Sequence, residues 1–240
     1  MTTFALVHGA WHGAWCWECL APELKRRGHR VVAVDLPCDD ATATFETYAE
    51  VVVRALEAQI AEDEEVVVVG HSLAGLTIPL VAARRPVRSL VYLCAMVPMP
   101  GRSFAEQLQI EPDTLLPEYR TGLSEPDGQG RTRWKDEAVA RSVFYADCDE
   151  RDARAAFEQL RPQAQTPYAK PCPIDAFPPT PRTYVVCGED RIVNPDVSRR
   201  VAHERLDADL VELPGSHSPF LSRPGKLAAV LHERSASPPE

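Results

Sequence analysis

One serine in this sequence has the surroundings of a catalytic nucleophile. Ser72 lies in the segment Gly70-His71-Ser72-Leu73-Ala74-Gly75, which follows a run of four valines and precedes a helix-like stretch, 76–84. A strand that runs into a sharp turn, with a serine at the apex and a helix behind it, is the nucleophile elbow of acyl-transfer enzymes. Small flanking residues let strand and helix pass close together. Ala74 stands where the pattern G-x-S-x-G has its second glycine.

A serine hydroxyl needs a base to accept its proton, and the base needs an orienting carboxylate. Behind an elbow of this kind the acid comes next in the chain, followed by the histidine. His217 follows the apolar stretch 210–213 and precedes the last helix-like stretch, so we predict that it is the base. Glu189 and Asp190 both follow the stretch 183–187, so either could supply the acid. Asp190 is preferred, and Glu189 is the alternative. We expect both loops at the carboxyl ends of strands, where open α/β sheets place their sites.

The oxyanion that forms during acyl transfer needs two backbone N–H donors. The amide of Leu73, directly after the nucleophile, is the first predicted donor. The second is expected in the loop 8–13, with the amide of Ala10 preferred. The glycines of that loop do not have the spacing G-x-G-x-x-G of a nucleotide-binding loop.

No metal or cofactor is predicted. His8 with His12, and His203 with nearby acids, lack a convincing third ligand. The spacing of Cys16 and Cys19 is that of redox motifs, but no thioredoxin-type pattern surrounds it.

Short apolar runs alternate with amphipathic stretches, which is typical of βαβ units and a parallel sheet. The predicted strands are 4–8, 30–35, 65–70, 89–95, 183–187 and 210–213. The predicted helices outside the middle of the chain are 15–27, 44–61, 73–84, 195–206 and 219–233. Several of the strands are uninterrupted β-branched runs, as strands covered on both faces should be.

The regular alternation breaks between residues 97 and 180, which hold 11 of the 22 prolines. Two helices are predicted there, 134–146 and 149–160. Long insertions in compact domains are usually functional, so we predict a mostly helical cap (lid), 97–180, inserted after the fourth strand. The core of the fold then comprises 1–96 and 181–234, and 235–240 is expected to be a disordered tail.

Composition excludes some classes of partner. The 240 residues carry a formal net charge of −9, which argues against nucleic acid, because binding phosphate needs a basic face. No run approaches the roughly 18 apolar residues of a membrane span, and the first residues lack the pattern of a signal peptide. Seven scattered cysteines fit a reducing compartment. We therefore expect a cytoplasmic protein, monomer or homodimer, whose partner is a small molecule.

Taken together, these motifs resemble the α/β-hydrolase superfamily. The opening Leu6-Val7-His8-Gly9-Ala10-Trp11-His12-Gly13-Ala14-Trp15-Cys16-Trp17 is similar to that of the plant methylesterase and hydroxynitrile lyase family and its bacterial esterase relatives. The resemblance spans nearly the whole chain. It includes Asp35-Leu36-Pro37 and the cap segment Phe144-Tyr145-Ala146-Asp147-Cys148. It implies an α/β-hydrolase fold with about six mostly parallel strands flanked by helices.

Two positions separate the branches of this family. The lyases that it resembles carry a threonine and a lysine where this sequence has Gly9 and Ser218. The resemblance therefore implies a serine hydrolase that cleaves a small or medium carboxylic ester through an acyl-enzyme. Trp11, Trp134 and Phe220 are proposed as apolar pocket walls.

Other functions on the same scaffold stay open, because function lies in the site and not in the fold. The alternatives are a lyase, a thioesterase, a natural-product tailoring enzyme and a non-catalytic small-molecule receptor.

Overall fold

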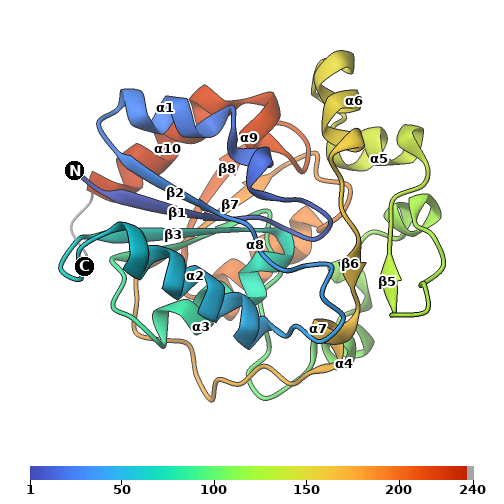
Figure 1. Cartoon of the computed structure of the whole chain (residues 1–240), viewed down its shortest axis with the longest axis horizontal. Helices are drawn as coiled ribbons and strands as arrows, with labels where there is room; N and C mark the ends of the chain where they lie inside the picture. The colour runs from blue at the N-terminus through green and yellow to red at the C-terminus, as the bar shows by residue number, and fades with distance from the viewer. Residues whose placement is uncertain (237–240) are drawn as a thin grey trace.

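Six parallel strands form the centre of the computed structural model, which describes residues 1–236 (Figure 1). They are β1 (Thr3–Val7), β2 (Arg30–Val34), β3 (Val66–His71), β4 (Ser89–Leu93), β7 (Arg182–Cys187) and β8 (Asp209–Leu213). Their order in the sheet is β2-β1-β3-β4-β7-β8. All six predicted strands and the α/β-hydrolase fold class are confirmed, with strand ends displaced by one or two residues.

Helices cover both faces of this sheet, which explains the unbroken run of valines in β3. Val67 and Val69 pack with α1 (Leu20–Arg26) and α10 (Pro224–Ala236) on one face. Val66 and Val68 pack on the opposite face, in a core with the helices listed next. Those helices are α2 (Phe45–Gln59), α3 (Ile78–Ala82) and α8 (Pro195–Glu204). Because both faces of β3 are buried, its four valines follow one another and do not alternate with polar residues.

Each of three predicted helices is divided into two shorter elements. In each case the second element has a proline in its first turn. Helix 15–27 is a short 3₁₀ turn, η1 (Ala14–Trp17), followed by α1, in which Pro22 lies in the first turn. Helix 73–84 is divided into η2 (Ser72–Leu76) and α3, with Pro79. Helix 219–233 is divided into α9 (Pro219–Ser222) and α10, with Pro224 first. Proline lacks an N–H and its ring collides with the carbonyl four residues earlier, so a helix accepts it only in its first turn.

The segment 97–180 lies largely beyond one edge of the core, with α5, α6 and β5 at the right in Figure 1. Less than half of it is helical, so the prediction of a mostly helical segment is wrong. Its elements are α4 (Phe104–Ile110), η3 (Pro112–Thr114), η4 (Pro117–Gly122), β5 (Arg131–Thr132), α5 (Glu137–Phe144), α6 (Glu150–Glu158), β6 (Gln163–Ala164) and α7 (Thr166–Ala169). β5 and β6 form a two-stranded antiparallel sheet. The two helices predicted there correspond to α5 and α6. The division into core and cap stays a prediction, and we call 97–180 the cap segment.

The expected disordered tail is wrong at its first two residues. α10 continues through Ala236, and Ser235 is buried, with its hydroxyl donating to the carbonyl of His232 at 2.8 Å. This bond and the burial extend the helix past the predicted end. Residues 237–240 lie outside the described part of the chain.

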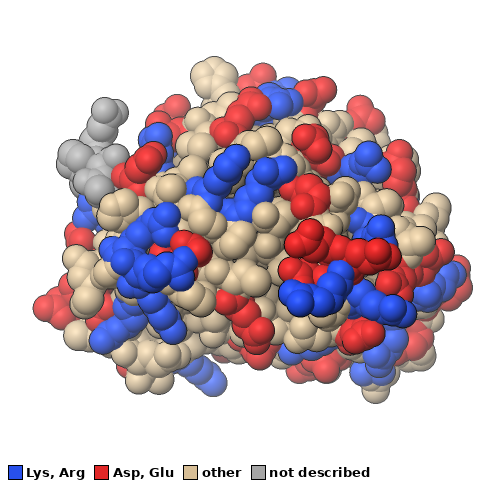
Figure 2. All heavy atoms as spheres, turned by 90° about the horizontal axis from the view of Figure 1, so that it is seen from above, with Lys and Arg blue, Asp and Glu red and all other residues tan. Residues whose placement is uncertain are grey.

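The surface agrees with a modest acidic excess. Acidic and basic side chains are interspersed over the face seen in Figure 2. Within residues 1–236, no helix combines the length and apolar character needed to cross a membrane.

Candidate active site

Ser72 lies at the junction of β3 and η2 with a φ of 53°. This left-handed conformation is unfavourable for a residue with a side chain and marks functional turns when surrounding contacts hold it. Glycines make the junction possible. A Cβ on Gly9 would lie 2.8 Å from Cβ of Ser72, and one on Gly70 would lie 2.7 Å from Cγ2 of Ile78. The first-strand loop and the helix therefore both approach the serine closely.

The departure from G-x-S-x-G at Ala74 does not disturb this turn. Ala74 is buried and packs in the core, and Ser72 keeps its left-handed backbone. The tightest approach falls one residue later, where a Cβ on Gly75 would collide with the carbonyl oxygen of Met96. The position in this turn that cannot take a methyl group is therefore Gly75, and not Ala74.

Asp190 and His217 meet at the carboxyl end of the sheet. Nδ1 of His217 donates to Oδ2 of Asp190 at 2.7 Å, and both residues are buried. The other carboxylate oxygen accepts from the amides of Ile192 and Val193 at 2.8 and 3.1 Å. Glu189, the alternative acid, is exposed. The structure thus brings Asp190, and not Glu189, to the imidazole.

The bond to Asp190 fixes the tautomer of His217. Nδ1 carries the proton, so Nε2 of the neutral ring is an acceptor. Among the described residues this Nε2 is buried and has no hydrogen-bond partner. It is therefore the nitrogen that is available to take a proton. Ser72 is only 5 % exposed, so the site is largely closed to solvent.

His71 supports His217 from behind, a role that sequence reasoning missed. Its Nε2 donates to the carbonyl of His217 at 2.9 Å, and the two ring centroids are 4.6 Å apart. Burial lowers the pKa of His71 well below its usual value, so the ring is neutral. Its place directly before the nucleophile was the only signal in the sequence.

The predicted oxyanion donors, Ala10 and Leu73, are both buried. Leu73 lies within η2. Among backbone hydrogen bonds of the described residues outside helices and strands, the amide of Ala10 donates to no carbonyl. Trp11, which follows Ala10, has a φ of 61°. A left-handed bulky residue here turns the loop sharply beside the elbow.

Two of the three proposed wall residues come together, with a third aromatic that was not predicted. The rings of Trp11 and Trp134 are 5.8 Å apart in an edge-to-face contact. Phe144 packs 4.9 Å from Trp134 and 5.7 Å from the ring of His217. In the sequence, Phe144 was noted only within the cap segment that carries the resemblance, whereas the structure places its ring beside His217.

The assignment of Phe220 to the pocket wall is wrong. Its side chain is 0 % exposed and packs on Trp17 at 4.9 Å and on His71 at 4.8 Å. It belongs to the core on the α1 and α10 face of the sheet, whereas Trp11 and Trp134 lie in the core of the other face. Phe220, which follows His217 in the chain, therefore packs in the core and does not line a pocket.

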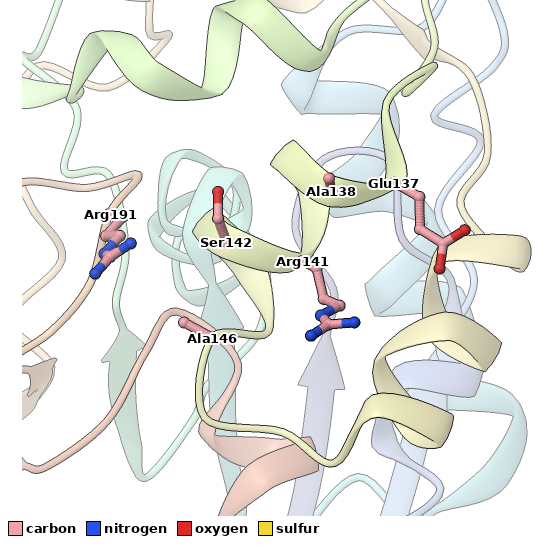
Figure 3. Close-up of a pocket in the computed structure, with 6 residues that line it drawn as sticks. All are labelled: Glu137, Ala138, Arg141, Ser142, Ala146 and Arg191. Carbon is pink, nitrogen blue, oxygen red and sulfur yellow. The ribbon is translucent and has the colours of Figure 1, made fainter.

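A surface hollow of about 680 Å³ lies between α5 and the loop after β7 (Figure 3). Arg141 and Arg191 line it, with Ser142 and Ala146. Arg141 already pairs with Glu150 at 2.9 Å. The hollow contains none of the predicted catalytic side chains, so it is separate from the site at Ser72. Across residues 1–236 no group of three His, Cys, Asp or Glu could hold a metal ion.

Comparison with known proteins agrees with this architecture. A profile described as the alpha/beta hydrolase family matches residues 4–230. Methylesterase 18 of Arabidopsis thaliana is 30% identical over 98% of this chain and 97% of its own length. The pyrethroid hydrolase of Sphingobium wenxiniae is 30% identical over 100% of this chain and 90% of its own.

Solved structures show the same likeness. The crystal structure of polyneuridine aldehyde esterase matches with a TM-score of 0.83 at 25% identity, covering 98% of this chain and 99% of that one. A pyrethroid hydrolase from Sphingobium faniae matches with a TM-score of 0.79 at 24% identity over 99% and 98% of the two chains.

Proposed function

The chain belongs to the alpha/beta hydrolase family, and from this premise we propose that its carboxylic ester hydrolase activity proceeds through an acyl-enzyme on Ser72. The observation that carries the proposal is the buried 2.7 Å bond between His217 and Asp190, at the same edge of the sheet as a serine held at φ 53°. Nucleophile, base and orienting acid are the three groups that acyl transfer requires.

In the first half-reaction Oγ of Ser72 attacks the ester carbonyl carbon. Nε2 of His217 accepts the hydroxyl proton, and Asp190 stabilises the imidazolium that forms. The amides of Ala10 and Leu73 donate to the carbonyl oxygen as it becomes an oxyanion. His217 then protonates the leaving alcohol, and the acyl group stays on Ser72.

In the second half-reaction water takes the place of the alcohol. His217 removes a proton from the water, which attacks the acyl carbon, and the regenerated serine leaves with the proton. The products are a carboxylic acid and an alcohol, and no cofactor takes part.

The aromatic cluster beside His217 supports a substrate class. Trp11, Trp134 and Phe144 pack on one another. Phe144 also packs on the ring of His217, near a serine that is nearly closed to solvent. We expect an ester with an apolar acyl part and a small alcohol. The names of the relatives support the small alcohol, since several are called methylesterases.

Gly9 favours hydrolysis over a lyase reaction. Its absent Cβ would lie 2.8 Å from Cβ of Ser72, so the threonine of the lyases could enter only if the loop moved. Ser218 likewise supplies no ammonium group next to the histidine.

Release of p-nitrophenol from acetate, butyrate and octanoate esters tests the proposal. We expect wild type to turn over at least one of these esters and Ser72→Ala to lose the activity while keeping its fold by circular dichroism. Retention of most activity in Ser72→Ala would overturn the role of the serine. A well-folded wild type that cleaves none of them, nor a methyl ester of an aromatic acid, would argue against ester hydrolysis.

A cytoplasmic location is also a proposal. It is supported by the seven cysteines, all of which are free thiols in the structure. Cell fractionation with a compartment marker tests it, and recovery outside the cytoplasm would contradict it.

A further inference from the structure

The loop that carries the predicted oxyanion donor Ala10 is held by hydrogen bonds from the cap segment. The hydroxyl of Tyr145 lies 2.9 Å from Nε2 of His12, and Nδ1 of His12 lies 2.8 Å from the carbonyl oxygen of Ala10. All three residues are buried. One chain of bonds therefore connects the end of α5 to the backbone of the loop.

The direction of these bonds is fixed by the acceptor at one end. A carbonyl oxygen can only accept, so Nδ1 of His12 carries the proton and donates to Ala10. In a neutral ring Nε2 is then an acceptor, and the hydroxyl of Tyr145 must donate to it. Burial lowers the pKa of His12 to about 3, which keeps the ring neutral at physiological pH.

Packing also fixes the plane of the His12 ring. It stacks on Trp15 with centroids 5.3 Å apart and an angle of 22° between the planes. The edge of Phe144 lies 5.0 Å away on the cap side. The imidazole is therefore held in one orientation before any substrate arrives.

The loop needs such support because its backbone is strained. Trp11 has a φ of 61°, a conformation that is unfavourable for a bulky residue and persists only where surrounding contacts hold it. Its carbonyl accepts from the amide of Arg161 at 2.7 Å, and its indole N–H donates to Thr132 at 3.1 Å. Thr132, Tyr145 and Arg161 all belong to the cap segment.

We propose that Tyr145 and His12 are positioning residues that aim the amide of Ala10 at the oxyanion, so that contact with the cap segment sets catalytic competence. This inference rests on the proposed function. It extends that function because neither residue touches the reacting atoms. The peptide units before and after Ala10 are linked through one Cα, so holding the carbonyl restricts the direction of the amide.

The variants separate the two bonds. Tyr145→Phe removes the first donor. His12→Asn keeps a side-chain NH₂ at the position of Nδ1, and so keeps the bond to Ala10, whereas His12→Leu removes both bonds. Tyr48→Phe is the matched control. Its hydroxyl is also buried and also bonds to the cap segment, accepting from Gln163 at 3.2 Å.

We expect Tyr145→Phe to lower kcat by about 10-fold with little change in KM, less than the 10²–10³ that loss of an oxyanion donor costs. His12→Asn should match it, and His12→Leu should fall further. In a double-mutant cycle the effect of Tyr145→Phe should largely vanish in the His12→Asn background. Tyr48→Phe should retain wild-type kcat.

Binding of an aryl trifluoromethyl ketone distinguishes positioning from a general structural role. Oγ of Ser72 adds to the ketone carbon, His217 takes the hydroxyl proton, and the carbonyl electron pair becomes an oxyanion. Affinity for this adduct should fall in proportion to kcat/KM in Tyr145→Phe, while affinity for the matching unreactive alcohol should not change. Equal losses for both ligands, or a kcat no lower than that of Tyr48→Phe, would overturn the inference.

Failure of the proposed function would look different. In that case wild type would hydrolyse no ester, or Ser72→Ala would remain active. An active, Ser72-dependent enzyme that is indifferent to Tyr145→Phe contradicts the positioning role alone.

Discussion

Ser72 and Trp11 both hold a left-handed backbone, and they lie on the two segments that face each other across Gly9. Neither conformation is intrinsically favourable for a residue with a side chain. Each is held by contacts from elsewhere in the chain. The carbonyl of Ser72 accepts from the amide of Met96 at 3.0 Å, and that of Trp11 accepts from the amide of Arg161. Two of the four described non-glycine residues with a positive φ thus lie where the proposed chemistry takes place.

The role of the Asp190 side chain can be tested by replacing one carboxylate oxygen with an NH₂ group. Asp190→Asn should lower kcat by about 10⁴, as loss of the orienting carboxylate does in serine proteases. The amide cannot both accept from His217 and stabilise the imidazolium. Rates of p-nitrophenyl ester hydrolysis measure this.

Glu189→Gln is the matched control, because the Glu189 side chain is exposed. It should stay within a few-fold of wild type. The reverse ranking of the two variants would mean that Glu189 is the acid.

Among the secondary-structure elements, η2 packs closely against the residues that follow β4. This close packing depends on Gly75. A Cβ there would meet the carbonyl of Met96 and Cβ of Ala95, which are backbone and a rigid methyl group. We expect Gly75→Ala to lower the free energy of unfolding by at least about 1–3 kcal/mol, the usual cost of overpacking. Urea denaturation measures it.

Gly128→Ala provides the comparison for this measurement. A Cβ on Gly128 would meet nothing within 4 Å. Its stability should remain within about 0.5 kcal/mol of wild type, as at surface sites without special features. Equal losses in the two variants would show that this close packing is not the cause.

The strands could be predicted because a strand that is buried on both faces has a continuous apolar sequence, such as the valines of β3. The divided helices could also have been predicted, since Pro22, Pro79 and Pro224 each forbid an earlier helical turn. The contact of Tyr145 with His12 could not, because the two residues are 133 positions apart and no local pattern pairs them.

Some residues of the candidate site could likewise be predicted from the sequence, and others could not. Ser72, Asp190 and His217 each follow a strand, so the sequence could place them at one edge of the sheet. The aromatic neighbours depend on how the cap segment packs, which no periodicity specifies. For this reason Phe144 was missed. Phe220 was wrongly placed because its position after His217 does not tell on which face of the sheet it packs.

For the molecule as a whole, buried neutral histidines make stability depend on pH. Burial lowers the pKa of His8 to about 4 and that of His12 to about 3, and it lowers that of His71 well below its usual value. Below pH 6.5 the unfolded chain binds protons at these rings and the folded chain does not, so acid favours unfolding. Stability should be full above pH 6.5 and fall as pH drops towards 4.

Each of these rings adds up to about 1.4 kcal/mol per pH unit to that fall. Urea denaturation at pH 7.5, 6.5 and 5.5 measures the slope. His12→Asn should make it shallower by up to this amount. His203→Gln, which changes an exposed side chain of α8, should leave it unchanged. A slope equal in wild type and His12→Asn would contradict the assignment.

The sheet order has a consequence for how activity arises from the chain. β1 to β4 precede the cap segment, and the proposed nucleophile follows β3, whereas the proposed acid and base follow β7 and β8, after the cap segment. Within the sheet, only the pairing of β4 with β7 joins the two halves. We expect a chain cut in the exposed stretch 125–129 to yield two fragments that are inactive alone, with ester hydrolysis returning when they reassociate. The fold therefore offers a natural division for a split reporter, in which hydrolysis reports that two fused proteins have met.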